Sequence, residues 1–210
     1  MRDEPSCAAA SAAMRIRLAG AADADDILSV YAPFIETPVT FEEEVPAQDS
    51  FRARIAGICG KFPCLVAEAD DELVGYAYAH ELRERVAFQW NAELSVYLAP
   101  RAQGRGLGRA LYAALIELLR DMGVKAVYGV VTSPNPASEH LHESFGFELM
   151  GTQPHAGFTC GAWHDVNWYV RLIAPFEDAP EPPVPFPAFA HGNPARVRGV
   201  LERANAQLAK

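Results

Sequence analysis

The 210-residue sequence predicts a single α/β domain, and three observations support this prediction. Half of the residues are apolar, which is enough for one substantial core in a chain of this length. Between residues 14 and 173, short alternating runs typical of strands occur between amphipathic runs typical of helices. From residue 174 onward the sequence becomes rich in proline. We therefore expect one folded domain over residues 14–173, followed by an extension of different character.

The expected elements follow from hydrophobic spacing, taken in chain order. Ile16 and Leu18 alternate with arginines, as in a half-buried strand. Ile27, Val30 and Tyr31 then recur at the spacing of one helix face. The same two patterns predict strands over residues 14–19, 64–69, 72–80, 92–98, 124–131, 148–157 and 162–172. They predict helices over residues 23–35, 49–60, 107–122 and 137–145.

Four other segments are expected outside these elements. Asp70-Asp71 separates two short β-rich runs and indicates a hairpin turn. Residues 1–13 are expected to be a flexible leader, with Met14 opening the folded part. Residues 174–193 are expected to be a semi-rigid, extended proline-rich linker. Residues 194–210 then predict a basic amphipathic helix that packs on the domain or on a dimer mate, or else binds a partner.

Composition excludes several classes of protein. A net charge of −9 and a pI near 5.1 argue against a nucleic-acid-binding protein, which needs a basic face for phosphate contacts. No run reaches the roughly 18 apolar residues of a membrane helix, so we expect no membrane partner. The cysteines form no CxxC pair and no zinc spacing, which predicts no metal and reduced thiols in the cytoplasm. They are Cys7, Cys59, Cys64 and Cys160.

The most informative stretch is a glycine-rich loop between a strand and a helix, Gln103-Gly104-Arg105-Gly106-Leu107-Gly108. Glycines let the backbone approach a pyrophosphate closely, while a helix N-terminus presents free N–H groups and a positive dipole end. No Lys-Ser/Thr follows, which excludes a Walker loop, and Arg109 takes the place of the last glycine of GxGxxG. A glycine-rich connection without a ligand is the alternative.

This pattern, Gln/Arg-x-x-Gly-x-Gly/Ala between strand and helix, resembles the acetyl-CoA loop of the GCN5-related N-acetyltransferases (GNAT). The resemblance covers residues 14–173 and includes Pro134-Asn135-Pro136 before a short helix ending in Gly146-Phe147. It implies a splayed, mixed, mostly antiparallel sheet flanked by helices, with acetyl-CoA as co-substrate. The residues it places at the cofactor are Val96, Tyr97, Leu98, Gln103, Gly104, Arg105, Gly106, Leu107, Gly108, Arg109 and Asn135. Asn135 can also cap the helix that follows it.

Further motifs narrow the resemblance to the phosphinothricin and methionine sulfone/sulfoximine acetyltransferase branch. They include Gly75-Tyr76-Ala77-Tyr78-Ala79, Trp90-x-x-Glu93-x-x-Val96-Tyr97, His142-Glu143 and Gly161-x-Trp163-His164-Asp165-Val166. The branch implies direct acetyl transfer to the amino group of a small anionic amino-acid analogue. Proteins of this branch are commonly homodimers, so the resemblance also implies a homodimer.

Two residues are candidates for proton transfer. An amine must lose a proton to attack a thioester, and Glu93 lies at the start of the strand that leads into the glycine-rich loop. The matching glutamate of the branch is proposed as the base; a strand carboxylate held by an arginine is the alternative. His142 stands where most of the superfamily has tyrosine, and it can serve as acid, as relay or as a hydrogen-bonded helix residue. Backbone N–H groups around Val96–Leu98 are placed to stabilise an oxyanion if the strands splay there.

A pair of arginines is the candidate substrate clamp. Arg83 and Arg85 are two residues apart, so in extended backbone both project to one face. Their guanidinium groups suit carboxylate and phosphinate, and a plain surface charge is the alternative. Phe88 stands where the branch has tyrosine, and it could wall the pocket together with Phe41, although both can be ordinary core residues.

Two other functions remain open from the sequence. The acetyl acceptor could be a polyamine or a protein N-terminus, although Arg83 and Arg85 argue against a polycation. The protein could also be an acyl-CoA-binding sensor without catalysis, whose C-terminal helix docks a partner. Turnover with any small amine separates the sensor from the enzymes.

Overall fold

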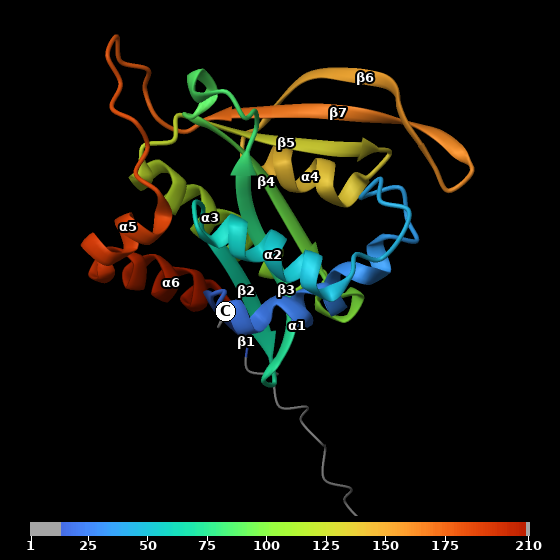
Figure 1. Ribbon diagram of the computed structural model, residues 1–210, viewed down its shortest axis with the longest axis horizontal. Coiled ribbons are helices and arrows are strands. Elements are labelled where there is room, and N and C mark those ends of the chain that lie inside the picture. Colours follow the sequence, from blue (N-terminus) through green and yellow to red (C-terminus); the bar gives the residue numbers. More distant parts are fainter. Residues whose placement is uncertain (1–13, 209–210) are drawn as a thin grey trace, which may run out of the picture.

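The protein contains one seven-stranded sheet in a computed structural model that describes residues 14–208. The expected leader over 1–13 and the final residues 209–210 lie outside the described residues. The strands are β1 (Met14–Leu18), β2 (Cys64–Ala69), β3 (Glu72–Glu81), β4 (Asn91–Leu98), β5 (Ala126–Ser133), β6 (Glu148–Thr159) and β7 (Ala162–Leu172). They are ordered β1-β2-β3-β4-β5-β7-β6, and only the pair β4–β5 is parallel (Figure 1). The expected α/β fold with a mixed, mostly antiparallel sheet is confirmed.

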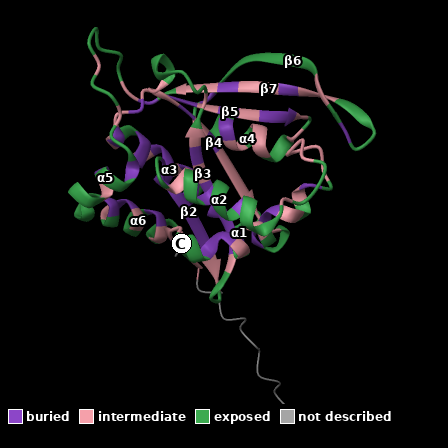
Figure 2. Cartoon of the chain, in the orientation of Figure 1, coloured by how far each residue is buried: buried purple, intermediate pink, exposed green. Residues whose placement is uncertain are grey.

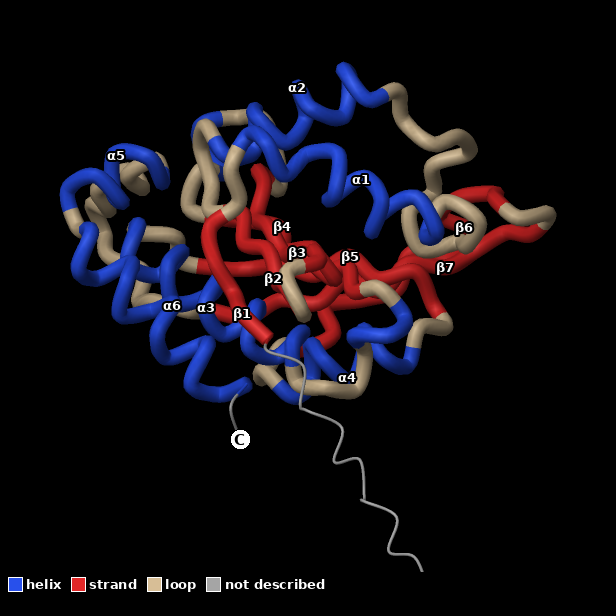
Figure 3. The backbone as a smooth tube through the Cα atoms, turned by 90° about the horizontal axis from the view of Figure 1, so that it is seen from below, coloured by secondary structure: helices blue, strands red, loops and turns tan. Residues whose placement is uncertain are grey.

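Helices cover both faces of the sheet (Figure 3). One face carries α1 (Ala24–Tyr31) and α2 (Gln48–Cys59), and the other carries α3 (Leu107–Met122), α4 (Pro136–Ser144) and α6 (Pro194–Leu208). The short helix α5 (Phe186–Gly192) lies beside α6. Two separate apolar clusters result, a larger one around α3 and a smaller one under α1 and α2. The sheet therefore has a core on each side, as expected for strands with near-continuous apolar runs.

Helix α3 forms the centre of the larger core. Leu107, Leu111, Leu115 and Leu118 recur every three or four residues and are fully buried. Burial of each leucine side chain contributes about 1.5–3 kcal/mol, so this face fixes α3 on the sheet. The helix ends at Gly123, whose φ of 99° is in the left-handed region that glycine adopts without strain. Its N-terminus, at Leu107, directly follows the glycine-rich loop that leads out of β4.

The strands β4 and β5 diverge in the middle of the sheet. They pair only from Asn91 with Ala126 to Glu93 with Tyr128. Beyond Glu93, β4 continues to Leu98 while it pairs with β3 alone. The expected splay is therefore present, and Glu93 occupies the fork.

The β6–β7 hairpin differs from the rest of the sheet in burial. Figure 2 shows β6 almost entirely exposed, whereas β2 and β3 are largely buried. Exposed apolar side chains follow its length, including Leu149, Met150, Phe158 and Trp163. At the other hairpin, Asp70 and Asp71 have φ of 52° and 64°, which confirms the expected tight turn between β2 and β3.

The C-terminal extension corrects the expectation of an extended linker over 174–193. Residues 186–192 form helix α5, and Phe186 and Phe189 are buried in the larger core. Proline does not prevent this helix, because Pro185 and Pro187 stand at its N-terminus, where the missing N–H has no intrahelical partner. The proline count at the end of the chain therefore misled the sequence interpretation, which overlooked the two phenylalanines three residues apart.

Helix α6 packs on the domain itself. Arg196 and Arg203 both contact Glu117 of α3 at 2.6 Å. Asn205 accepts a hydrogen bond from the Ile16 backbone N–H at 2.6 Å and donates one to the Ile16 carbonyl at 2.9 Å. The asparagine thus satisfies both backbone groups of a residue in edge strand β1. Within residues 14–208, no helix is long and apolar enough to cross a membrane.

Candidate active site

The gap beside β4 exposes backbone hydrogen-bond donors. Ala99 N–H donates to the Val74 carbonyl, and Tyr97 pairs with Tyr76 two residues earlier. Because alternate residues of an antiparallel strand direct their N–H groups to opposite sides, Val96 and Leu98 face away from β3. On that side β5 has already diverged. The backbone donors expected around Val96–Leu98 therefore point into the splayed gap.

The glycine-rich loop closes one end of this gap. Gly104 and Gly106 have φ of 71° and 81°, a conformation that suits glycine, and the space where a Cβ would project is open at both. Gly106 is the N-cap of α3 and no side chain caps the helix there, so its first N–H groups face outward. Gln103 Nε2 donates to the Leu98 carbonyl at 3.1 Å and ties the loop to β4. Leu107, by contrast, is fully buried and serves as an anchor.

The remaining predicted cofactor residues lie around this helix end. Arg105 is exposed, and Gly108 follows it in the first turn of α3. Arg109 donates to Ser144 Oγ at 2.6 Å and lies over the Phe145 ring, so it joins α3 to the end of α4. Asn135 caps α4 by accepting a hydrogen bond from Ser138 N–H at 3.2 Å. The capping role expected for Asn135 is therefore present.

Glu93 is partly buried at the fork of the sheet. Its side chain is 22% exposed, and Oε1 lies 3.6 Å from His80 Nε2 on the paired residue of β3. Its negative charge also acts on tyrosines of three elements. Burial raises the pKa of Tyr78, Tyr97 and Tyr112, and the charge of Glu93 raises each further. The hydroxyl groups of these tyrosines therefore lose their protons less readily than exposed tyrosines do.

His142 lies in the core with defined hydrogen bonds. It is 3% exposed, and its ring packs against the backbone of Gly129, where any side chain would clash. Nδ1 lies 2.7 Å from the Ser138 carbonyl, and Nε2 lies 3.0 Å from Tyr112 Oη. A carbonyl only accepts, so Nδ1 carries the proton and Nε2 accepts from the tyrosine in the neutral ring. Burial lowers the pKa of His142, and the bond to Ser138 partly offsets this effect.

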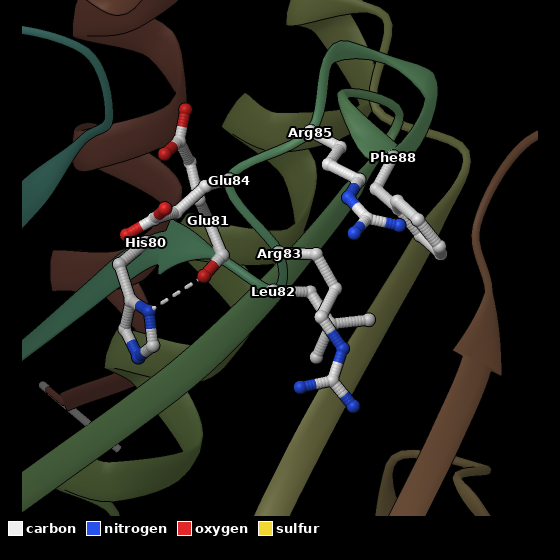
Figure 4. Close-up of a pocket in the computed structure, with 7 residues that line it drawn as sticks. All are labelled: His80, Glu81, Leu82, Arg83, Glu84, Arg85 and Phe88. Carbon is white, nitrogen blue, oxygen red and sulfur yellow. Dashed lines mark hydrogen bonds between the residues drawn. The ribbon is translucent and has the colours of Figure 1, made fainter.

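Three of the four predicted substrate residues line a cavity before β4. The cavity has a volume of about 720 Å³ and is lined by His80, Glu81, Leu82, Arg83, Glu84, Arg85 and Phe88. Figure 4 shows Arg83, Arg85 and Phe88 pointing to one side of the loop, and His80, Glu81 and Glu84 to the other. The Arg83 guanidinium lies 5.7 Å from the centre of the Trp168 ring. The structure thus brings the two arginines and Phe88 together.

Phe41 lies apart from this group. Its ring packs against Gly157 of β6 at a point where a Cβ would come within 2.5 Å, and it makes an edge contact with His164. The lining described above does not include Phe41. Its predicted contact with substrate therefore stays a prediction, while its packing under the hairpin is visible.

Sequence reasoning missed two residues at the site, His80 and Tyr112. His80 lines the cavity and faces Glu93, a juxtaposition that depends on the register of β3 against β4. Tyr112 belongs to the buried face of α3, where its hydroxyl meets His142 and lies 3.5 Å from the Leu94 carbonyl. A buried tyrosine usually finds a hydrogen-bond partner, so Tyr112 on an otherwise aliphatic face was the available signal.

Known proteins resemble both the sequence and the fold. Residues 16–168 match the family described as the acetyltransferase (GNAT) domain. The phosphinothricin N-acetyltransferase of Streptomyces viridochromogenes is 36% identical over 82% of this chain and 92% of its own length. The L-methionine sulfoximine/L-methionine sulfone acetyltransferase of Pseudomonas aeruginosa is 36% identical over 79% of this chain and 98% of its own length.

A solved structure agrees with these relatives. The GNAT superfamily phosphinothricin acetyltransferase of Sinorhizobium meliloti, in complex with acetyl-CoA, superposes with a TM-score of 0.76. It is 31% identical and covers 83% of this chain and 98% of its own. The resemblance noted in the sequence is thereby confirmed. This chain belongs to the GNAT acetyltransferase family.

Proposed function

We propose that this enzyme transfers an acetyl group from acetyl-CoA directly to the amino group of a small anionic amino-acid analogue. The proposed acceptors are of the phosphinothricin, methionine sulfone or methionine sulfoximine type. The observation that carries the proposal is the position of Glu93 at the fork of β4 and β5. Its carboxylate faces His80, which lines the cavity that also includes Arg83 and Arg85, and beyond Glu93 β4 diverges from β5 toward the glycine-rich loop.

The residues around that gap fit acetyl-CoA. Gly104 and Gly106 leave open space beside the backbone, and the uncapped start of α3 offers N–H groups to a pyrophosphate. The unpaired edge of β4 offers backbone groups to an amide-bearing chain, as one strand does to another. The solved relative that carries acetyl-CoA has the same fold. When bound, the co-substrate supplies the activated acetyl group as a thioester.

Each residue of the site then has a separate task. Arg83 and Arg85 hold the anionic groups of the acceptor, and Phe88 contacts its carbon chain. Glu93 takes a proton from the amino group, directly or through a water molecule. The N–H groups of Val96 and Leu98 donate to the oxygen on which charge develops. This division of tasks assigns no step to a metal ion.

His142 is proposed to act as a relay through Tyr112. The histidine ring itself is buried, but its hydrogen bond orients the tyrosine hydroxyl, which lies beside β4 one residue beyond Glu93. Tyr112 gives its single hydroxyl proton to the departing thiolate, which leaves as the thiol, and the tyrosinate regains a proton from water; neutral His142 accepts the hydrogen bond of the hydroxyl before and after this transfer. The relay serves the departing thiolate.

We further propose that the enzyme is a homodimer. The exposed apolar side chains of the β6–β7 hairpin form a surface that a second copy would cover. Sedimentation of the purified protein tests the dimer, and a monomer at micromolar concentration would contradict it.

Cys59, Cys64 and Cys160 are free thiols, which fits the reducing cytoplasm expected from the sequence.

A thiol-release assay tests the activity. The protein is incubated with acetyl-CoA and, separately, phosphinothricin, methionine sulfone, methionine sulfoximine, a polyamine and a peptide with a free N-terminus. We expect release above background with at least one of the three amino-acid analogues and a lower kcat/KM with the polyamine and the peptide. Preference for the polyamine or the peptide would support the corresponding alternative. Binding of acetyl-CoA without turnover of any amine would contradict the proposed activity and support the acyl-CoA-binding sensor.

A further inference from the structure

We propose that the C-terminal extension is a brace for the substrate loop: residues 174–186 hold the segment 82–90 that carries Arg83, Arg85 and Phe88. This inference rests on the proposed function for its meaning, although the contacts stand by themselves. The extension begins beyond the family match, which ends at residue 168. In Figure 1 it rises beside the loop that precedes β4 before it turns down into α5.

The first contact is made at the C-terminal end of the substrate loop. Trp90 Nε1 donates to the backbone carbonyl of Glu181 at 2.9 Å, across 91 positions of sequence. Trp90 follows Phe88 by two residues and directly precedes β4. A hydrogen bond at Trp90 therefore restrains the loop just where it enters the strand that carries Glu93.

Lys125 provides a second connection at the same end. Its backbone N–H donates to the Trp90 carbonyl at 2.8 Å, and its carbonyl accepts from Ile173 N–H at 2.8 Å. Its side chain is only 12% exposed and pairs with Glu177 at 2.6 Å. The lysine beside it lowers the pKa of Glu177. A nearly buried ammonium needs such a partner, so Lys125 fixes the start of the extension against Trp90.

The other end of the loop is reached through Lys61. The Lys61 side chain forms an ion pair with Glu81, which ends β3 and lines the cavity. The Lys61 carbonyl accepts a hydrogen bond from Phe186 N–H at 2.9 Å, and Phe186 is buried. The extension therefore holds both ends of the segment. At one end it bonds Trp90 directly, and at the other it bonds Lys61, which pairs with Glu81 just before the segment.

These contacts matter because the segment has few supports of its own. Residues 83–88 are all exposed, and a single 3-10 turn over Val86–Phe88 is their only regular structure. Arginine side chains on an unrestrained loop lose conformational entropy when they close on a ligand. A loop held at both ends loses less on binding. The brace therefore acts on the affinity for the acceptor and leaves acetyl-CoA, on the far side of Glu93, unaffected.

The test uses full-length variants that weaken the brace without touching the clamp. Trp90→Phe keeps the aromatic ring and removes the donor, and Lys125→Met keeps the stem and removes the charge. Lys125→Arg is the conservative variant that can still pair with Glu177. Arg203→Gln is the matched control, because it breaks an ion pair of the same extension on α6, far from the loop in sequence.

Two measurements are made on each variant: steady-state kinetics with the best acceptor, and hydrogen–deuterium exchange of peptides over residues 82–90 without ligands. We expect Trp90→Phe and Lys125→Met to raise the KM of the acceptor about fivefold to tenfold, with kcat and the acetyl-CoA KM changed less than about twofold. Exchange over 82–90 should increase in both. Lys125→Arg and Arg203→Gln should behave as wild type.

The outcomes separate the brace from the proposed function. Unchanged exchange over 82–90 in both weakened variants overturns the brace, whatever the enzyme acetylates. A lowered melting temperature with wild-type KM and wild-type exchange also overturns it, because the contacts would then stabilise the fold without restraining the loop. If the wild type acetylates none of the amines, the proposed function fails, and the exchange measurement alone decides the brace.

Discussion

The two loops that flank β4 are built on different principles. The loop after β4, residues 99–106, works through its backbone: two glycines at positive φ and the open start of α3. The loop before β4, residues 82–90, works through side chains, and it is held in place by contacts with residues 174–186 of the C-terminal extension. A backbone site can be formed by a short local sequence, whereas a side-chain site depends on whatever holds the side chains in place.

Glu93 lies between the two loops, so its replacement should have the largest effect and should spare both binding sites. We expect Glu93→Gln to lower kcat about 10²- to 10⁴-fold, because the amine then lacks a proton acceptor. The KM values for acetyl-CoA and the acceptor should change little. Steady-state kinetics in both substrates measure this. Glu202→Gln, an exposed carboxylate on α6, is the control, and a kcat for Glu93→Gln within twofold of wild type would remove Glu93 as the base.

The side-chain loop should fail selectively when its charges are removed. Each of Arg83→Ala and Arg85→Ala is expected to raise the acceptor KM roughly tenfold to hundredfold, since charge-assisted hydrogen bonds contribute about 1.5–3 kcal/mol. The acetyl-CoA KM should not change. Arg198→Ala on α6 controls for the loss of an exposed arginine. An unaltered acceptor KM in both clamp variants would refute the clamp.

The contrast also explains how far the sequence could be interpreted. The glycines at 104 and 106 were identified correctly as a turn into a helix, because few other contexts need glycine at such spacing. The fold followed from the same local patterns. The bond between Trp90 and Glu181 and the pairing of His80 with Glu93 were beyond reach, since each depends on tertiary contacts between distant segments or on strand register. Helix α5 was missed because prolines were counted without regard to helix position.

The backbone loop should respond to a change of conformation alone. Gly106→Ala places a Cβ in open space but at φ of 81°, so strain of about 1–2 kcal/mol is the main consequence. We expect a several-fold higher acetyl-CoA KM and an unchanged acceptor KM. Gly57→Ala, in the last turn of α2 and also in open space, is the matched control and should stabilise the protein by about 0.5–1 kcal/mol. An acetyl-CoA KM equal to wild type in Gly106→Ala would contradict the backbone cradle.

The smallest expected effect concerns pH and stability at His142. Burial lowers the pKa of His142 in the folded protein below its ordinary value of 6.5. As the pH falls, His142 is therefore protonated in the unfolded chain at a higher pH than in the folded protein. The resulting stabilisation is complete above about pH 6.5 and is lost as the pH falls through the lowered pKa. Melting temperatures at about pH 7.5 and about pH 5.5 should therefore differ less in His142→Gln than in wild type. His140→Gln, exposed on the same helix, should keep the wild-type difference; an equal difference in His142→Gln would contradict the assignment.

Asn205 has a consequence for assembly. By bonding both backbone groups of Ile16, it occupies edge strand β1 in the way a neighbouring strand would. A sheet with two free edges can add copies in both directions and grow without limit. Here Asn205 uses the N–H and carbonyl of Ile16 in the middle of edge strand β1, so strand pairing at that edge is hindered, whereas among residues 14–208 no such side chain is described against β6. Pairing through the β6 edge alone would end after two copies, whereas pairing through both edges would extend into a fibre.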